Sequence, residues 1–151
     1  MHGGKSIQLL QEYQPQRNEK NTIMSLDGTK ITNFIMAINP CSYKFNNGDS
    51  GRTHYGMISQ DIEDEMNALG MTSQDFAGFI KSPKTKEVMT KDAEGNEIRT
   101  DEVIENEYVY GLRYEEFISP LIKTVQCIKI EKDAEIIYLQ QQINDLKAKI
   151  G

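Results

Sequence analysis

The chain has 151 residues, which is enough for about one domain, and a net charge of −6. Lys and Arg are scattered among Asp and Glu, without the basic stripe typical of nucleic-acid-binding proteins, so we expect no nucleic-acid partner. No run of eighteen apolar residues exists, so the sequence predicts no membrane span.

The few metal-binding and thiol side chains are isolated in the sequence. His2 and His54 are far apart, and Cys41 and Cys127 form no CxxC pair. Since a structural zinc site needs about four ligands at close spacing, we expect neither a metal nor a cofactor. The two cysteines are expected to be buried as small apolar residues.

Composition divides the chain into three zones. Residues 1–20 are rich in Gln and poor in apolar residues, which predicts an extended N-terminal arm. Residues 21–114 alternate between helical and strand-like patterns and predict a globular α+β unit. Residues 115–151 have the pattern of one long helix.

The globular zone begins with a predicted helix and a predicted hairpin. Apolar residues recur at helical spacing over 31–38, and the helix is expected to end before Pro40. Two strand-like runs, 42–45 and 54–58, flank a cluster of Asn, Gly and Asp, which is typical of a β-hairpin.

A second helix is predicted after the hairpin, with apolar residues from Ile62 to Leu69. Ser59 is expected to be its N-cap and Gly70 its C-terminal stop. Arg52 and Glu63 are candidates for an ion pair, within or between chains, that would contribute about 0–1 kcal/mol.

The segment 81–107 is dominated by charged residues and leaves two alternatives. One is a solvated loop. The other is a projecting hairpin with strands near 87–90 and 97–103, around a turn at Glu94-Gly95-Asn96. Such a hairpin would be too polar to form its own core and would need a partner to pack on.

The terminal helix has one apolar face between Phe117 and Ile128, and Pro120 is compatible with its first turn. Further on, apolar residues alternate at three- and four-residue steps, which is the seam of a coiled coil. This seam consists of Ile136, Leu139, Ile143, Leu146 and Ile150.

So narrow an apolar stripe favours self-association, because an isolated helix gains little stability without burying its apolar face. Ile at a and Leu at d favour a parallel dimer. Ile137 and Tyr138 add apolar surface outside the seam, which suits a wider bundle. The e and g positions hold Gln140, Gln142, Lys147 and Lys149 and offer no complementary ion pairs. These patterns alone leave dimer and trimer open.

The central block resembles a known signature. Tyr43-Lys44-Phe45, followed by GRTHYGMISQDIE over 51–63, is similar to an aromatic strand followed by G-R-x-H-x-G-(apolar)-I-A-Q-E-(apolar)-E. Residues 112–114, 121–122 and 125–126 resemble the Y…L-I-x-A-I-Q segment that leads into a terminal coiled coil in the same family. From about Arg17 to its end, the chain resembles the endosialidase-type intramolecular chaperone domain, an autoprocessing serine peptidase domain of phage tailspikes, tail fibres and neck appendages.

This resemblance implies a homotrimer whose terminal helices form a coiled coil. Its projecting arms would contact the upstream fibre or spike portion of the same polypeptide and help it to fold. It also implies a location in the host cytoplasm during virion assembly, or on the virion tail if the domain is not cleaved off.

The resemblance further implies self-cleavage at the N-terminal boundary by a serine–lysine mechanism, in which the lysine activates the serine hydroxyl. Lys20 and Ile23 match the K-x-x-I portion of the family motif, and His54 matches a histidine that supports cleavage. Pro15, which has no hydroxyl, stands where the serine is expected. Two alternatives follow: a self-cleaving domain with an unidentified nucleophile, or a cleavage-inactive trimerisation or adaptor module. For His54, a hydrogen-bonded structural role in its strand is the competing interpretation.

Overall fold

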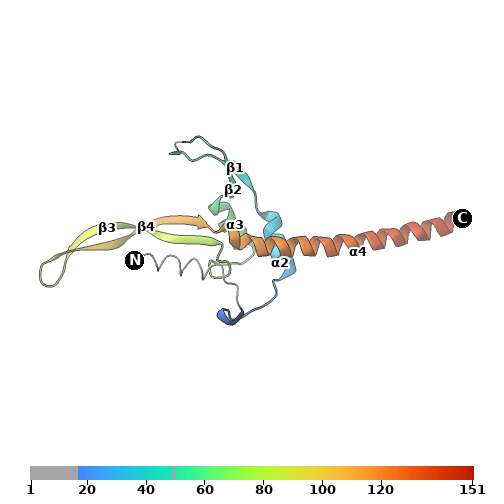
Figure 1. Ribbon diagram of the computed structural model, residues 1–151, viewed down its shortest axis with the longest axis horizontal. Coiled ribbons are helices and arrows are strands. Elements are labelled where there is room, and N and C mark those ends of the chain that lie inside the picture. The colour runs from blue at the N-terminus through green and yellow to red at the C-terminus, as the bar shows by residue number, and fades with distance from the viewer. Residues whose placement is uncertain (1–16, 49) are drawn as a thin grey trace.

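The computed structural model describes residues 17–48 and 50–151 and has a mixed α+β fold (Figure 1). It consists of two antiparallel hairpins, two short helices and a long C-terminal helix, as the sequence predicts, and the long helix packs on α2. The elements in chain order are η1 (Arg17–Glu19), α2 (Gly28–Ala37), β1 (Cys41–Tyr43), β2 (His54–Gly56), α3 (Ser59–Ala68), β3 (Phe79–Lys91), β4 (Glu97–Leu112), η2 (Tyr114–Phe117) and α4 (Ile118–Ile150).

The predicted extended arm over residues 1–20 lies, up to residue 16, outside the described residues. Its last part is not extended, because Arg17–Glu19 form one 3-10 turn. The backbone N–H of Lys20 closes this turn by donating to the carbonyl of Arg17 at 3.2 Å. The structure describes only this last part of the predicted arm, so the arm as a whole stays a prediction.

The two short helices occupy the segments predicted for them, but one predicted cap is wrong. The Asp27 carboxylate caps α2 by accepting a hydrogen bond from the backbone N–H of Lys30 at 3.0 Å. Ser59 is the first residue of α3 rather than its cap, and Ile58 occupies the cap position without a side-chain hydrogen bond. Gly70 follows α3 in the left-handed region, at φ +66°, and ends it as predicted.

A small aromatic core joins α2, α3 and the start of α4. Phe34 of α2 is fully buried, with its ring centroid 5.5 Å from that of Phe76 and 6.3 Å from that of Phe117. Ile62, Met66, Met71 and Phe79 complete the buried cluster. Because α2 packs on α4 and Phe117 directly precedes α4, this core fixes the direction in which the long helix leaves the domain.

Both cysteines are free and half-buried, rather than fully buried as expected. Cys127 of α4 lies close to Gly28 of α2: a Cβ added at Gly28 would stand 2.8 Å from its Sγ. Glycine at position 28 therefore permits the close contact between the two helices.

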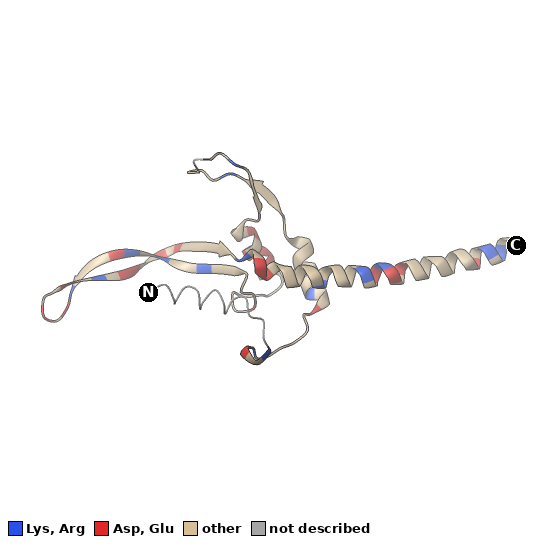
Figure 2. Cartoon of the chain, viewed as in Figure 1, with Lys and Arg blue, Asp and Glu red and all other residues tan. Residues whose placement is uncertain are grey.

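The charged segment 81–107 forms the hairpin rather than the loop. Its strands, β3 and β4, are longer than predicted and pair from Phe79–Leu112 to Lys91–Glu97, with a register shift between Pro83 and Thr85. Asn106, opposite this shift, has a positive φ of 61°. The charged residues of β3 are mostly Lys and those of β4 mostly Asp and Glu (Figure 2), and most side chains beyond the shift are exposed. This hairpin therefore has almost no core of its own.

The long helix α4 extends away from the body on the side opposite the β3–β4 hairpin (Figure 1). Pro120 and Thr124, near its start, are buried, and the Thr124 hydroxyl donates to the Pro120 carbonyl at 2.9 Å. Every residue from Lys129 to Gly151 is exposed. Within the described ranges, no helix is both long and apolar enough to cross a membrane.

Candidate functional site

His54, the histidine singled out by the family resemblance, lies on β2 within an aromatic cluster. Its ring stacks on Tyr43 of β1 at 5.6 Å between centroids and meets Phe45 edge-on at 4.9 Å. In the part of the chain that the structure describes, the imidazole forms no hydrogen bond. Ring packing, rather than the hydrogen bond expected for a structural strand histidine, positions this side chain.

Tyr114 links this cluster to the base of α4. Its hydroxyl oxygen accepts a hydrogen bond from the backbone N–H of Met57 at 3.3 Å. A Cβ at Gly56 would collide with the same hydroxyl, so only glycine allows this approach. Burial, reinforced by the nearby Tyr114 phenol, raises the pKa of Tyr43. The block that carries the sequence signature is thus attached to η2, the 3-10 turn that leads into the C-terminal helix.

Lys20, the other predicted catalytic residue, is exposed and directly follows η1. Among the described residues, no hydrogen bond or ion pair joins its side chain to His54. Pro15, at the position expected for the nucleophile, lies outside the described residues. The same ranges hold no group of three His, Cys, Asp or Glu side chains close enough to bind a metal ion.

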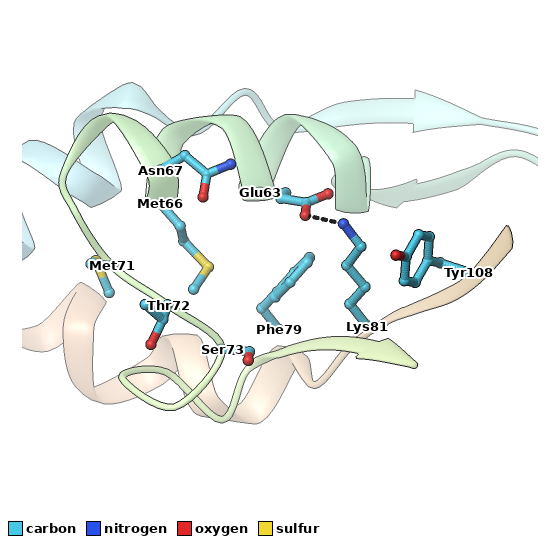
Figure 3. A pocket seen from close by; sticks show the side chains of 9 residues that line it. All are labelled: Glu63, Met66, Asn67, Met71, Thr72, Ser73, Phe79, Lys81 and Tyr108. Carbon is cyan, nitrogen blue, oxygen red and sulfur yellow. Dashed lines mark hydrogen bonds and ion pairs between the residues drawn. The ribbon is translucent and has the colours of Figure 1, made fainter. Parts of the chain in front are cut away.

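A contact that the sequence did not predict anchors the β3–β4 hairpin to α3. The ammonium of Lys81 pairs with the Glu63 carboxylate at 2.5 Å and lies 4.5 Å from the centre of the Tyr108 ring (Figure 3). The pair borders a cavity of about 290 Å³ between α3 and the hairpin. The predicted Arg52–Glu63 pair is therefore wrong within one chain, since Lys81 is the partner of Glu63.

Replacing Lys81 by Met is expected to lower the midpoint temperature more than replacing Lys84 by Met. The Lys81 and Glu63 side chains are only 29% and 22% exposed, whereas Lys84 and its partner Glu107 are 53% and 52% exposed and more strongly screened. Thermal unfolding followed by circular dichroism measures both variants. Equal losses would contradict an anchoring role for Lys81.

The same pair predicts how the effect changes with pH. The hydrogen bond to Glu63 raises the pKa of Lys81 above its ordinary value of 10.5. The stabilisation by the pair is therefore fully present from neutral pH up to pH 10.5 and is lost as the pH rises further, through the folded-state pKa of Lys81. The difference between wild type and Lys81→Met is expected to be constant at neutral pH and to shrink above pH 10.5.

The predicted seam residues form an exposed apolar stripe along the outer half of α4. Ile136 is 62% exposed, and the other four range from 46% for Ile143 to 86% for Ile150. Ile137 and Tyr138, beside the stripe, are exposed as well. Such a contiguous apolar surface on a long, solvent-surrounded helix marks an interaction surface.

The sequence and the structure of this chain were compared with those of known proteins. A family model described as "Chaperone of endosialidase" matches residues 16–71, which include His54, Glu63 and the rest of the signature block. A search of curated proteins gave no match.

Two of the solved structures that share the fold are intramolecular chaperones. One is the carboxy-terminal domain of the bacteriophage T5 L-shaped tail fibre with its intramolecular chaperone domain, with 14% identity and a TM-score of 0.55 over 82% of this chain. This chain spans 31% of that structure's length. The other, described as a novel intramolecular chaperone, has 19% identity and a TM-score of 0.52, over 79% of this chain and 98% of its own. Together with the family match, they confirm the resemblance of this chain to the endosialidase-type intramolecular chaperone domains of phage tail fibres.

Proposed function

We propose that this chain is an intramolecular chaperone that forms a homotrimer through α4 and assists the folding of a phage tail fibre or tailspike. The fibre would be the upstream portion of the same polypeptide, and the domain would act in the host cytoplasm during virion assembly. The observation that carries the proposal is the exposed apolar seam of α4, on a helix whose residues from Lys129 to Gly151 are all exposed in the described chain.

The energetics of α4 support self-association. Burying a Leu or Ile side chain contributes about 1.5–3 kcal/mol, and the seam from Ile136 to Ile150 leaves five such side chains at least 46% exposed. Three helices rather than two are proposed because Ile137 and Tyr138, 68% and 64% exposed, widen the apolar surface beyond a two-stranded seam.

The β3–β4 hairpin is the proposed contact for the upstream fibre. It carries exposed apolar side chains at Met89, Val103 and Val109 among its charged residues. It points away from the body opposite to α4 (Figure 1), so association of the helices would leave it free. Lys81 and Glu63 hold its base against α3.

Shortening this hairpin in a fusion with the upstream fibre tests the proposal. Thr85 and Val103 are paired, so replacing residues 86–102 by Asn-Gly closes a two-residue turn between them. We expect the isolated domain to keep its number of associated chains in light scattering, while the yield of soluble trimeric fibre falls severalfold. The matched control replaces only the turn residues 93–95, and is expected to keep the full yield. Normal fibre yield after the long deletion would contradict the chaperone role of the hairpin.

Release by self-cleavage is a separate proposal, in which Lys20 and His54 would act with a nucleophile outside the described residues. It predicts that a fusion with the upstream fibre yields two bands and that Lys20→Ala abolishes the second. A single band in the wild-type fusion would instead make this chain an uncleaved trimerisation or adaptor module.

A further inference from the structure

The apolar seam of α4 continues toward the start of the helix on the same heptad frame. Counting back from Ile136, which is an a position, the preceding a and d positions are Lys132, Lys129, Val125, Ile122 and Ile118. The three apolar members of this set are between 53% and 59% exposed. One surface stripe therefore runs from the first to the last turn of α4.

This stripe is distinct from the face of α4 that packs on the domain. At 100° per residue, the inner face carries Pro120 and Thr124, which are buried, and Cys127, which contacts α2. Val125 lies one residue from Thr124 and therefore about 100° around the helix. The seam is free along its whole length while α4 remains docked on α2.

Two consecutive positions of the seam are lysines. Lys129 occupies an a position and Lys132 the next d position, and both side chains are more than half exposed. Figure 2 shows a band of basic and acidic residues between uncharged stretches in the middle part of α4. Two adjacent charged layers are costly in an apolar seam, since even one polar a position lowers coiled-coil stability.

Acidic residues flank both lysines at the edge of the seam. Asp133, at the e position, pairs with Lys129, and Glu135, at the g position, pairs with Lys132 at 2.9 Å. The hydrogen bond to Glu135 raises the pKa of Lys132. The e and g side chains of a coiled coil face the neighbouring helices, so these carboxylates can reach lysines of another copy.

We propose that Lys129 and Lys132 form two charged layers that fix the register of associated α4 helices, each lysine being matched by Asp133 or Glu135 of a second copy of this chain. The inference rests on the self-association proposed above. In the matched register, the lysines of all copies lie in the same two layers, next to Asp133 and Glu135. Every apolar layer then faces another apolar layer.

Other alignments bring unfavourable layers together. A shift by one heptad places Lys129 of one copy opposite Ile136 or Ile122 of another, which buries a charge among apolar side chains. An antiparallel pair that matched the lysine layers would carry Leu146 and Ile150 past Ile118, where α4 of the partner begins. The lysines thus select one parallel register at a cost in stability.

Removing the two charges tests the inference. The variant Lys129→Ile/Lys132→Leu makes the seam apolar throughout. The matched control Ala134→Leu/Ala148→Ile adds similar apolar side chains at f positions, on the opposite side of the helix. Each is made in a Cys41→Ser/Cys127→Ser background that carries a spin label at Gln141→Cys, another exposed f position.

Light scattering then measures the mass, and pulsed electron paramagnetic resonance measures the distances between labels on different copies. We expect the unsubstituted seam and the control to give one narrow distance distribution. The lysine variant is expected to associate with a higher midpoint temperature but to show additional distances, because each heptad of shift displaces the labels by about 10 Å along the axis.

The outcomes separate this inference from the proposed function. An associated chain whose lysine variant keeps the single distribution would overturn the role of the lysine layers and leave self-association standing. Broadening in the control as well would also overturn it, because apolar additions outside the seam would then suffice. A monomeric wild-type chain would contradict self-association itself.

Discussion

Replacing Leu139 and Ile143 together by Asp is expected to convert the associated chain into monomers. These side chains occupy adjacent d and a layers in the middle of the outer seam and are 54% and 46% exposed in the single chain. Each buried Leu or Ile contributes about 1.5–3 kcal/mol, and in a trimer both layers lose this contribution in every copy. A change of about 1.4 kcal/mol corresponds to a tenfold change in affinity. The affinity between copies is therefore expected to fall by more than about 100-fold.

The control for this variant is Gln141→Asp/Asn144→Asp. It adds the same two charges to the same part of α4, at exposed positions outside the seam. We expect its mass, measured by light scattering, to equal that of the wild type. The globular part of the Leu139→Asp/Ile143→Asp variant is expected to stay folded, because α2 packs on the first turns of α4. A trimer that survives this double substitution would show that the seam is not the contact between copies.

Replacing Phe34 by Ala is expected to lower the free energy of unfolding of the globular part by about 3–5 kcal/mol. Phe34 is fully buried, and its ring contacts Phe76 and Phe117 from the segments before β3 and α4. Removing the ring would leave a cavity between α2 and the base of α4. The core is too small to fill this cavity by relaxing around it.

Met36 provides the comparison for Phe34 within the same helix. It is 67% exposed, so Met36→Ala is expected to change the free energy of unfolding by less than about 0.5 kcal/mol. Urea denaturation at one fixed protein concentration measures both, because the stability of an associating chain depends on concentration. Similar losses in the two variants would contradict a core centred on Phe34.

The helices and the short β1–β2 hairpin could be predicted from the sequence because their signals are local. Spacing of apolar residues located α2, α3 and α4, and the left-handed Gly70 ended α3 where expected. The prediction of Ser59 as the N-cap of α3 was wrong by one residue. A serine at the start of an apolar periodic segment fits both the cap position and the first helical position, so the sequence pattern does not distinguish them.

The β3–β4 hairpin could not be decided from the sequence, because its residues are too polar to show which face is buried. Only its base, with Phe79 and Leu112 packed at the core, has a clear apolar environment. The Glu63–Lys81 pair was likewise missed, since it joins residues of two elements whose relative position depends on the tertiary fold.

The two residues predicted for cleavage depend on the family resemblance rather than on local pattern. The structure gives His54 a place between Tyr43 and Phe45 and leaves Lys20 exposed. The packing of His54 was not predicted, because the hairpin signal pairs β1 with β2 but does not give the register that sets His54 opposite Tyr43. Catalytic roles for both therefore remain predictions.

The solution mass of the wild-type chain tests the central claim most directly. Light scattering after size exclusion, over a tenfold range of concentration, is predicted to give the mass of three chains throughout, because the α4 seam is buried only in the assembly. A monomer, or a dimer that persists over the same range, would contradict the trimeric chaperone.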